Sequence, residues 1–117
     1  MIKLKQISNV IYIHMPPIQA LNNNLSNYQD TDWSSGWIFV ADVTSLTLSF
    51  LCDYNCTLTI SYSIDQLENI IYQETSSIVS NVLLQFINKE VKTRYIKFDI
   101  TGITVGSDLL TQGFYHV

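Results

Sequence analysis

The chain has 117 residues, a net charge of −4 at pH 7, 47% hydrophobic residues and 14% charged residues. This length corresponds to one domain, and the high apolar content excludes an intrinsically disordered chain. With six basic residues and a negative net charge there is no basic surface to bind a phosphate backbone, so we expect no nucleic-acid partner. No run of about 18 apolar residues occurs, so we expect no membrane partner.

Residue usage favours strands over helices. The chain contains 15 Ile, 9 Asn and 7 Tyr but 2 Ala and 1 Arg. β-Branched and aromatic residues suit extended backbone, whereas Ala and Arg are among the best helix formers. This composition predicts an all-β domain. It is also typical of an AT-rich genome, because the abundant residues use AT-rich codons.

The N-terminal third predicts little regular structure. Residues 2–15 alternate loosely between apolar and polar side chains and predict a first strand region. The pair Pro16-Pro17 ends it, because proline cannot donate to a strand ladder. Residues 16–36 are polar and rich in Asn and Asp, which predicts a long surface loop with a short helical turn at 18–21.

Two segments in the middle of the chain alternate clearly. In residues 46–52 the even positions are mostly apolar, and in residues 57–64 the apolar side chains again recur at every second position. A period of two is what a half-buried strand requires. Because residues 53–55 separate the two segments, the pattern predicts a β-hairpin with a three-residue turn.

The remaining segments complete an all-β domain. Further strands are predicted at residues 70–75, 81–87, 94–101 and 112–117. Within the third of these, Ile96, Phe98 and Ile100 are expected to face inward. About eight short strands at intervals near ten residues predict an antiparallel β-sandwich that is jelly-roll-like. Residues 1–117 are therefore expected to form a single β-sandwich domain, with residues 37–117 as its main sandwich.

The two cysteines lie on either side of the predicted turn. If residues 53–55 form a hairpin loop, Cys52 and Cys56 face each other at a spacing that allows a disulfide. The alternative is a pair of reduced, partly buried thiols in a chain made in a reducing compartment, which we favour.

No catalytic motif is present. Nucleophilic catalysis requires a base beside the nucleophile, and the two histidines, His14 and His116, lie near opposite ends of the chain. No glycine-rich phosphate loop and no zinc-ligand spacing occur. We therefore expect no enzyme, no catalytic residue, no cofactor and no metal.

Aromatic residues supply the candidate binding site. The site residues we expect, as a ligand surface or a protein interface, lie in or beside predicted loops: Tyr28, Asp32, Trp33 and Tyr54. Aromatic rings at such positions stack on sugars or anchor interfaces. Trp37 is expected in the core, and Trp33 either caps one end of the sandwich or is free to bind.

Residues 43–50, the segment 56–65 with its Ser63-x-Asp65 ending, and the Arg94-Tyr95 strand at 93–98 resemble a recurrent viral module. It is a small jelly-roll-like β-sandwich domain found in phage tail and baseplate proteins and in proteins of large DNA viruses and their satellites, the virophages. The resemblance implies a sandwich without catalytic activity that assembles as a trimer or as part of a fibre.

These features predict a non-enzymatic viral protein, either a virion-associated structural component or a host-interaction component. We expect it to act as a homo-oligomer, with a trimer favoured, and to contact other virion proteins or glycans. The N-terminus lacks the apolar core of a signal peptide, so the expected location is the virion or the host cytoplasm. The alternative function is a carbohydrate-binding module that uses loop aromatics.

Overall fold

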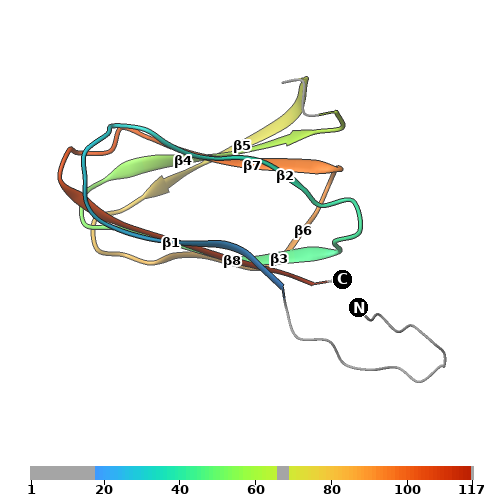
Figure 1. Ribbon diagram of the computed structural model, residues 1–117, viewed down its shortest axis with the longest axis horizontal. Coiled ribbons are helices and arrows are strands. Elements are labelled where there is room, and N and C mark those ends of the chain that lie inside the picture. The colour runs from blue at the N-terminus through green and yellow to red at the C-terminus, as the bar shows by residue number, and fades with distance from the viewer. Residues whose placement is uncertain (1–17, 66–68, 117) are drawn as a thin grey trace.

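Eight antiparallel strands make up the regular structure in a computed structural model of the chain, which describes residues 18–65 and 69–116 (Figure 1). The described residues contain no helix, and so none that is long and apolar enough to cross a membrane. The strands are β1 (Ile18–Tyr28), β2 (Trp33–Phe39), β3 (Ser45–Cys52), β4 (Cys56–Ser63), β5 (Ile70–Ile78), β6 (Leu84–Glu90), β7 (Tyr95–Thr101) and β8 (Ser107–His116).

The strands form two four-stranded sheets that face each other (Figure 1). One sheet has the order β1-β8-β3-β6 and the other has the order β2-β7-β4-β5. Consecutive strands lie in opposite sheets except for β4 and β5, which pair directly. This is the strand order of a jelly roll, so the predicted all-β, jelly-roll-like sandwich is confirmed.

Alternation along the strands builds the core. In β3, Leu46, Leu48 and Phe50 are buried and the residues between them are partly exposed. The expected inward residues of β7 are 0 to 1% exposed. Phe50 and Phe98 join the two layers, with 5.8 Å between their ring centroids. Because side chains on a strand point alternately to its two faces, one face of each sheet supplies this core.

The prediction of a long loop at residues 16–36 is wrong. Strand β1 occupies Ile18–Tyr28 and β2 begins at Trp33, so the expected helical turn is absent as well. Asn22, Asn23 and Asn24 pair with residues 110–112 of β8. Every residue but proline offers a backbone donor and acceptor whatever its side chain, so a polar segment joins a sheet when a partner strand is in place. The strand region predicted at 2–15 lies outside the described residues.

The hairpin predicted from residues 46–64 is also wrong. Both segments are strands, but β3 lies in one sheet and β4 in the other. The connection between them crosses from sheet to sheet and is held by long-range hydrogen bonds. The Asp53 carboxylate accepts from the backbone N–H of Asp108 at 3.0 Å, and the Asn55 side-chain oxygen accepts from that of Ser80 at 2.8 Å. These bonds come from parts of the chain that a local pattern does not include.

The other predicted strands are present with shifted ends. The segment 70–75 lies in β5, 94–101 contains β7, and residues 112–116 of the last predicted strand form the second half of a longer β8, while residue 117 lies outside the described residues. The segment 81–87 begins too early, because Asn81 has a positive φ of 60° in the turn before β6. Turn residues of this kind end a ladder although their neighbours are apolar.

Candidate functional site

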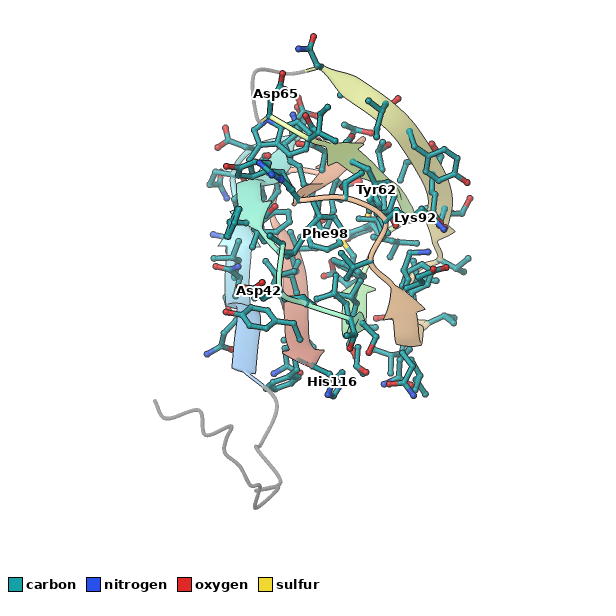
Figure 2. All side chains as sticks on the ribbon, turned by 90° about the vertical axis from the view of Figure 1, so that its right-hand side faces the viewer. Asp42, Tyr62, Asp65, Lys92, Phe98 and His116 are labelled. Atoms are coloured by element: carbon teal, nitrogen blue, oxygen red, sulfur yellow. The ribbon has the colours of Figure 1, made fainter. Side chains whose placement is uncertain are left out.

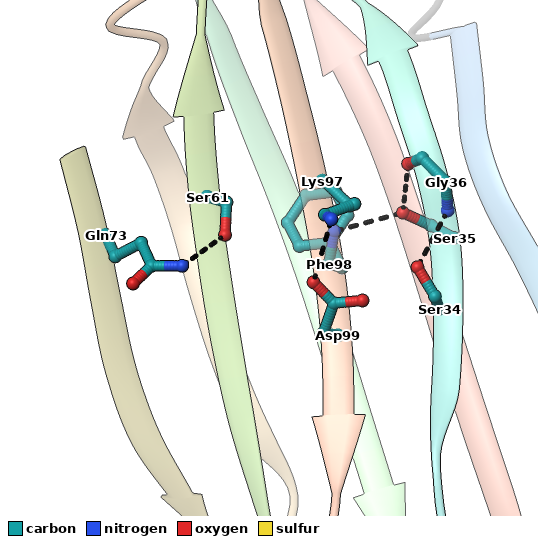
Figure 3. Close-up of polar contacts among 8 residues, drawn as sticks. All are labelled: Ser34, Ser35, Gly36, Ser61, Gln73, Lys97, Phe98 and Asp99. Carbon is teal, nitrogen blue, oxygen red and sulfur yellow. Dashed lines mark hydrogen bonds and ion pairs between the residues drawn. The ribbon is translucent and has the colours of Figure 1, made fainter. Parts of the chain in front are cut away.

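The outer face of the β2-β7-β4-β5 sheet carries a row of polar side chains. Trp37, Lys97, Ser61 and Gln73 lie side by side across the four strands. The Lys97 Nζ lies 4.8 Å from the centroid of the Trp37 ring and 3.7 Å from Oδ2 of Asp99. Gln73 donates a hydrogen bond of 3.0 Å to the Ser61 hydroxyl, as Figure 3 shows. The row therefore consists of two contacts, Lys97 with Trp37 and Gln73 with Ser61.

A groove lies beside this row, toward the end of the sandwich where β1 connects to β2. Its volume is about 450 Å³, and we call it the Trp33 groove. It is lined by Asp32, Trp33, Ser34, Thr59, Asp99 and Thr101. The register explains the gathering, because Ser34 and Thr59 are the two neighbours of Asp99 in the sheet.

Several polar groups of the Trp33 groove have no partner. Within the described part of the chain, the Asp32 carboxylate and the hydroxyls of Thr59 and Thr101 make no side-chain hydrogen bond or ion pair. Trp33 lines the same groove, and its side chain is partly buried against the core. The unpartnered groups can accept and donate hydrogen bonds to a hydroxyl-rich ligand.

The structure brings together three of the four predicted site residues. Asp32 and Trp33 line the groove, and the Tyr28 hydroxyl donates a hydrogen bond of 2.7 Å to the Asp32 carbonyl. Burial, followed by the charges of Asp30 and Asp32, raises the pKa of Tyr28, so it stays protonated and holds this turn. Tyr54 is 51% exposed on the β3–β4 connection and does not line the groove.

The expectation for Trp37 is wrong. Trp37 lies on the outer face under Lys97, and it is Trp33 that packs against the core. The cause is a bulge in β2 between Ser34 and Trp37, where Gly36 has a φ of 71°. The Ser35 hydroxyl fills the interrupted ladder by accepting a hydrogen bond from the backbone N–H of Phe98 at 3.0 Å (Figure 3). One extra residue reverses which face the following side chains occupy.

The two cysteines are free thiols at the crossing from β3 to β4, and both are buried. Burial, followed by the neighbouring Cys52, raises the pKa of Cys56 to about 12. The reduced pair that we favoured over a disulfide stays a prediction. A thiol with such a pKa is protonated at neutral pH and is a poor nucleophile.

A partly buried polar network joins the two sheets and was not expected from the sequence. The Tyr62 hydroxyl donates to Oε2 of Glu74 at 2.6 Å, and the Lys89 Nζ lies 2.6 Å from Oε1 of the same carboxylate. Burial opposes ionisation of Glu74, but the hydrogen bonds from Lys89 and Tyr62 outweigh it and hold its pKa below the ordinary value. Burial and the bond to Glu74 raise the pKa of Tyr62. One feature of the sequence could have revealed this network: alternation along β5 assigns the carboxylate of Glu74 to the inner face.

Comparisons with known proteins give one match of fold. No protein-family model and no curated protein matches the chain. A solved structure, that of the phage protein "PBSX exported protein XepA", is similar to it with a TM-score of 0.62 and 13% sequence identity. The match covers 87% of this chain and 37% of that protein. At this identity the likeness is one of fold, and the chain spans little more than a third of the length of XepA.

Proposed function

We propose that this chain is a non-enzymatic structural component of a virus-type particle. The observation that carries the proposal is the strand order β1-β8-β3-β6 over β2-β7-β4-β5, because jelly rolls of this order recur in viral capsid domains. The fold match to a phage exported protein and the resemblance of residues 43–50, 56–65 and 93–98 to virion modules support the same class. A fold hosts many functions, so the proposal requires its own test.

The environment of the reactive side chains supports a role without catalysis. Burial raises the pKa of the Cys56 thiol to about 12, so it keeps its proton at neutral pH. A protonated thiol is a poor nucleophile. We propose that the surfaces of the sandwich, and not a reaction centre, carry the function.

Such a component works as copies of itself together with other virion proteins. With 14% charged residues the exterior is formed largely by hydroxyl, amide and apolar side chains, which pair under closed symmetry. The trimer implied by the resemblance stays a prediction. The location that follows is the particle itself.

Particle association is tested by fractionation. Particles purified from producing cells on a density gradient should contain this chain at a fixed ratio to the major coat protein. The ratio should survive a high-salt wash, because few charges are available for a purely electrostatic contact. The amount of major coat protein in the particle fraction, which the wash should leave unchanged, is the internal control. Recovery of the chain in the soluble fraction alone would contradict the proposal.

A second candidate function is recognition of a glycan. The specific observation in its favour is the Trp33 groove, where Trp33, two carboxylates and unpartnered hydroxyls line about 450 Å³. A concave site with a few polar groups is a common arrangement for small-ligand sites. The groove differs from the expected loop cluster because it excludes Tyr54 and adds Asp99.

The groove is tested with isosteric variants. If it binds a saccharide, Asp32→Asn and Asp99→Asn should each weaken binding of the best ligand on a glycan array by about tenfold, which corresponds to one lost charge-assisted hydrogen bond. Asp42→Asn removes an exposed carboxylate elsewhere and should leave binding unchanged. An array without any bound glycan, or equal binding by all three variants, would eliminate this function.

A further inference from the structure

The sandwich has two open flanks, and one of them combines the end strands β5 and β6. In the sheet orders, β5 pairs with β4 alone and β6 pairs with β3 alone, so each has a backbone edge without a partner strand in the described chain. The ion pair between Lys89 and Glu74 shows that the two strands lie on the same side. Figure 2 shows Tyr62 and Lys92 on this side. We call this side the β5/β6 flank.

Strand β5 has a regular ladder over most of its length. Natural edges are blunted by bulges, prolines and charged residues. The ladder between β4 and β5 is regular from Cys56–Ile78 to Tyr62–Tyr72, and its one register shift lies at the end of the ladder, between Tyr62 and Ser63, where Ile71 is left without a partner. The other three end strands, β1, β2 and β6, are each interrupted by a bulge within their ladders. Strand β5 is therefore the edge best suited to accept another strand.

The charge and apolarity of β5 favour a partner like itself. Its one charged residue, Glu74, is neutralised inside the flank by Lys89. Ile70, Ile71 and Tyr72 are 40%, 58% and 49% exposed, and Ile87 of β6 is 68% exposed on the same flank. Two copies that meet here bring together apolar side chains and unpaired backbone groups without facing like charges.

We propose that the β5/β6 flank is the interface between two copies of this chain. Strand β5 pairs antiparallel with β5 of the second copy around a two-fold axis, which joins two four-stranded sheets into one of eight strands. This inference rests on the proposed homo-oligomer and identifies the surface through which its copies meet. An isologous contact closes at two copies, so it gives a dimer in place of the trimer that the resemblance implies.

The area of the flank suits a dimer. A strand of nine residues is about 30 Å long, and two layers about 10 Å apart make a strip about 20 Å wide, or about 600 Å² per copy. Both copies together bury about 1,200 Å², which lies at the lower end of specific interfaces. Backbone hydrogen bonds along the new ladder add direction to this contact.

The test uses the full chain and a charge placed on the edge. Thr75 is exposed at the middle of β5, and Thr75→Lys places a cation beside the two-fold axis, where the two copies repel each other. Ser26→Lys makes the same change in charge on β1, another end strand. Light scattering after size-exclusion chromatography at tens of micromolar should give twice the 13.4 kDa chain mass for the wild type and for Ser26→Lys. Thr75→Lys should give one chain mass.

A second measurement separates loss of pairing from loss of fold. The far-ultraviolet dichroism of Thr75→Lys should match the wild type, and amide exchange in β5 of the wild type should slow as concentration rises. An oligomer whose mass Thr75→Lys leaves unchanged, or one of three chains, would overturn the flank but preserve the homo-oligomer. A monomeric wild type would overturn both.

Discussion

Phe98→Ala is expected to lower the free energy of unfolding by about 4 kcal/mol, because truncating a buried phenylalanine removes apolar contacts and leaves a cavity. Phe98 is fully buried at the centre of β7, and its ring lies against Phe50 of the facing sheet. The labelled side chain lies between the layers in Figure 2. Urea unfolding followed by tryptophan fluorescence measures the change. Most single domains have a total of 5 to 15 kcal/mol, so this one ring accounts for a large share.

The matched control is Val105→Ala, which truncates a side chain that is 53% exposed between β7 and β8. It should change the unfolding free energy by less than about 0.5 kcal/mol. The slope against urea should be the same for both variants and the wild type, which shows that the same surface is exposed on unfolding. A loss below about 1 kcal/mol for Phe98→Ala would contradict the packing between the sheets.

Glu74→Gln is expected to destabilise the fold by about 2 kcal/mol at pH 7. The substitution keeps the shape and an acceptor for Tyr62 but leaves the Lys89 ammonium, whose side chain is 16% exposed, without its counter-charge. An unpaired and largely buried charge costs more than the original pair contributed. Glu90→Gln is the control, because the Glu90 side chain is 80% exposed and 3.9 Å from Lys92. Exposed pairs of this kind contribute little.

The same carboxylate makes stability depend on acid. The folded pKa of Glu74 lies below its ordinary value of 4.5, so the unfolded chain binds the proton more readily. Its contribution is fully present above about pH 5.5, a unit above the unfolded value, and is lost as the pH falls through the folded pKa. The wild type should therefore lose more stability than Glu74→Gln between neutral pH and pH 3. Parallel pH profiles for the two proteins would show that folding does not lower the pKa of Glu74.

Replacing both partners of the pair tests the origin of the effect. Glu74→Leu with Lys89→Met removes both charges and leaves side chains of similar size. The double variant should be more stable than either single variant, because neither charge is left without its partner. Additive losses in the double-mutant cycle would mean that the two residues act independently.

The sequence determined the strand character of this protein and much of its core. In β3, β4 and β7 the period of two is a local property of the chain, so the buried positions of β7, Ile96, Phe98 and Ile100, follow from reading it. Residue usage also predicted an all-β domain, and the number and spacing of the segments predicted a jelly-roll-like sandwich. These features depend on each segment taken separately.

The candidate site was predicted only in part. Asp32, Trp33 and Tyr28 were expected because aromatic and acidic residues near loops are exposed to ligands. Asp99 was missed, because a residue in the middle of β7 becomes part of a groove only when β2 and β4 lie on either side of it. Tyr54 satisfied the same sequence criterion as Trp33 but lies on a different connection.

Tertiary structure alone decided three features, and the physical reason is the same for each. Strand β1 forms because β8 supplies hydrogen-bond partners to a segment without alternation. A short connection can reverse within one sheet or cross between two sheets. Strands β3 and β4 lie in different sheets because hydrogen bonds from residues distant in the sequence hold the crossing connection. Trp33 and Trp37 occupy opposite faces because one bulge shifts the register between them. Alternation fixes which side chains share a face of a strand, whereas pairing between distant strands fixes what that face meets.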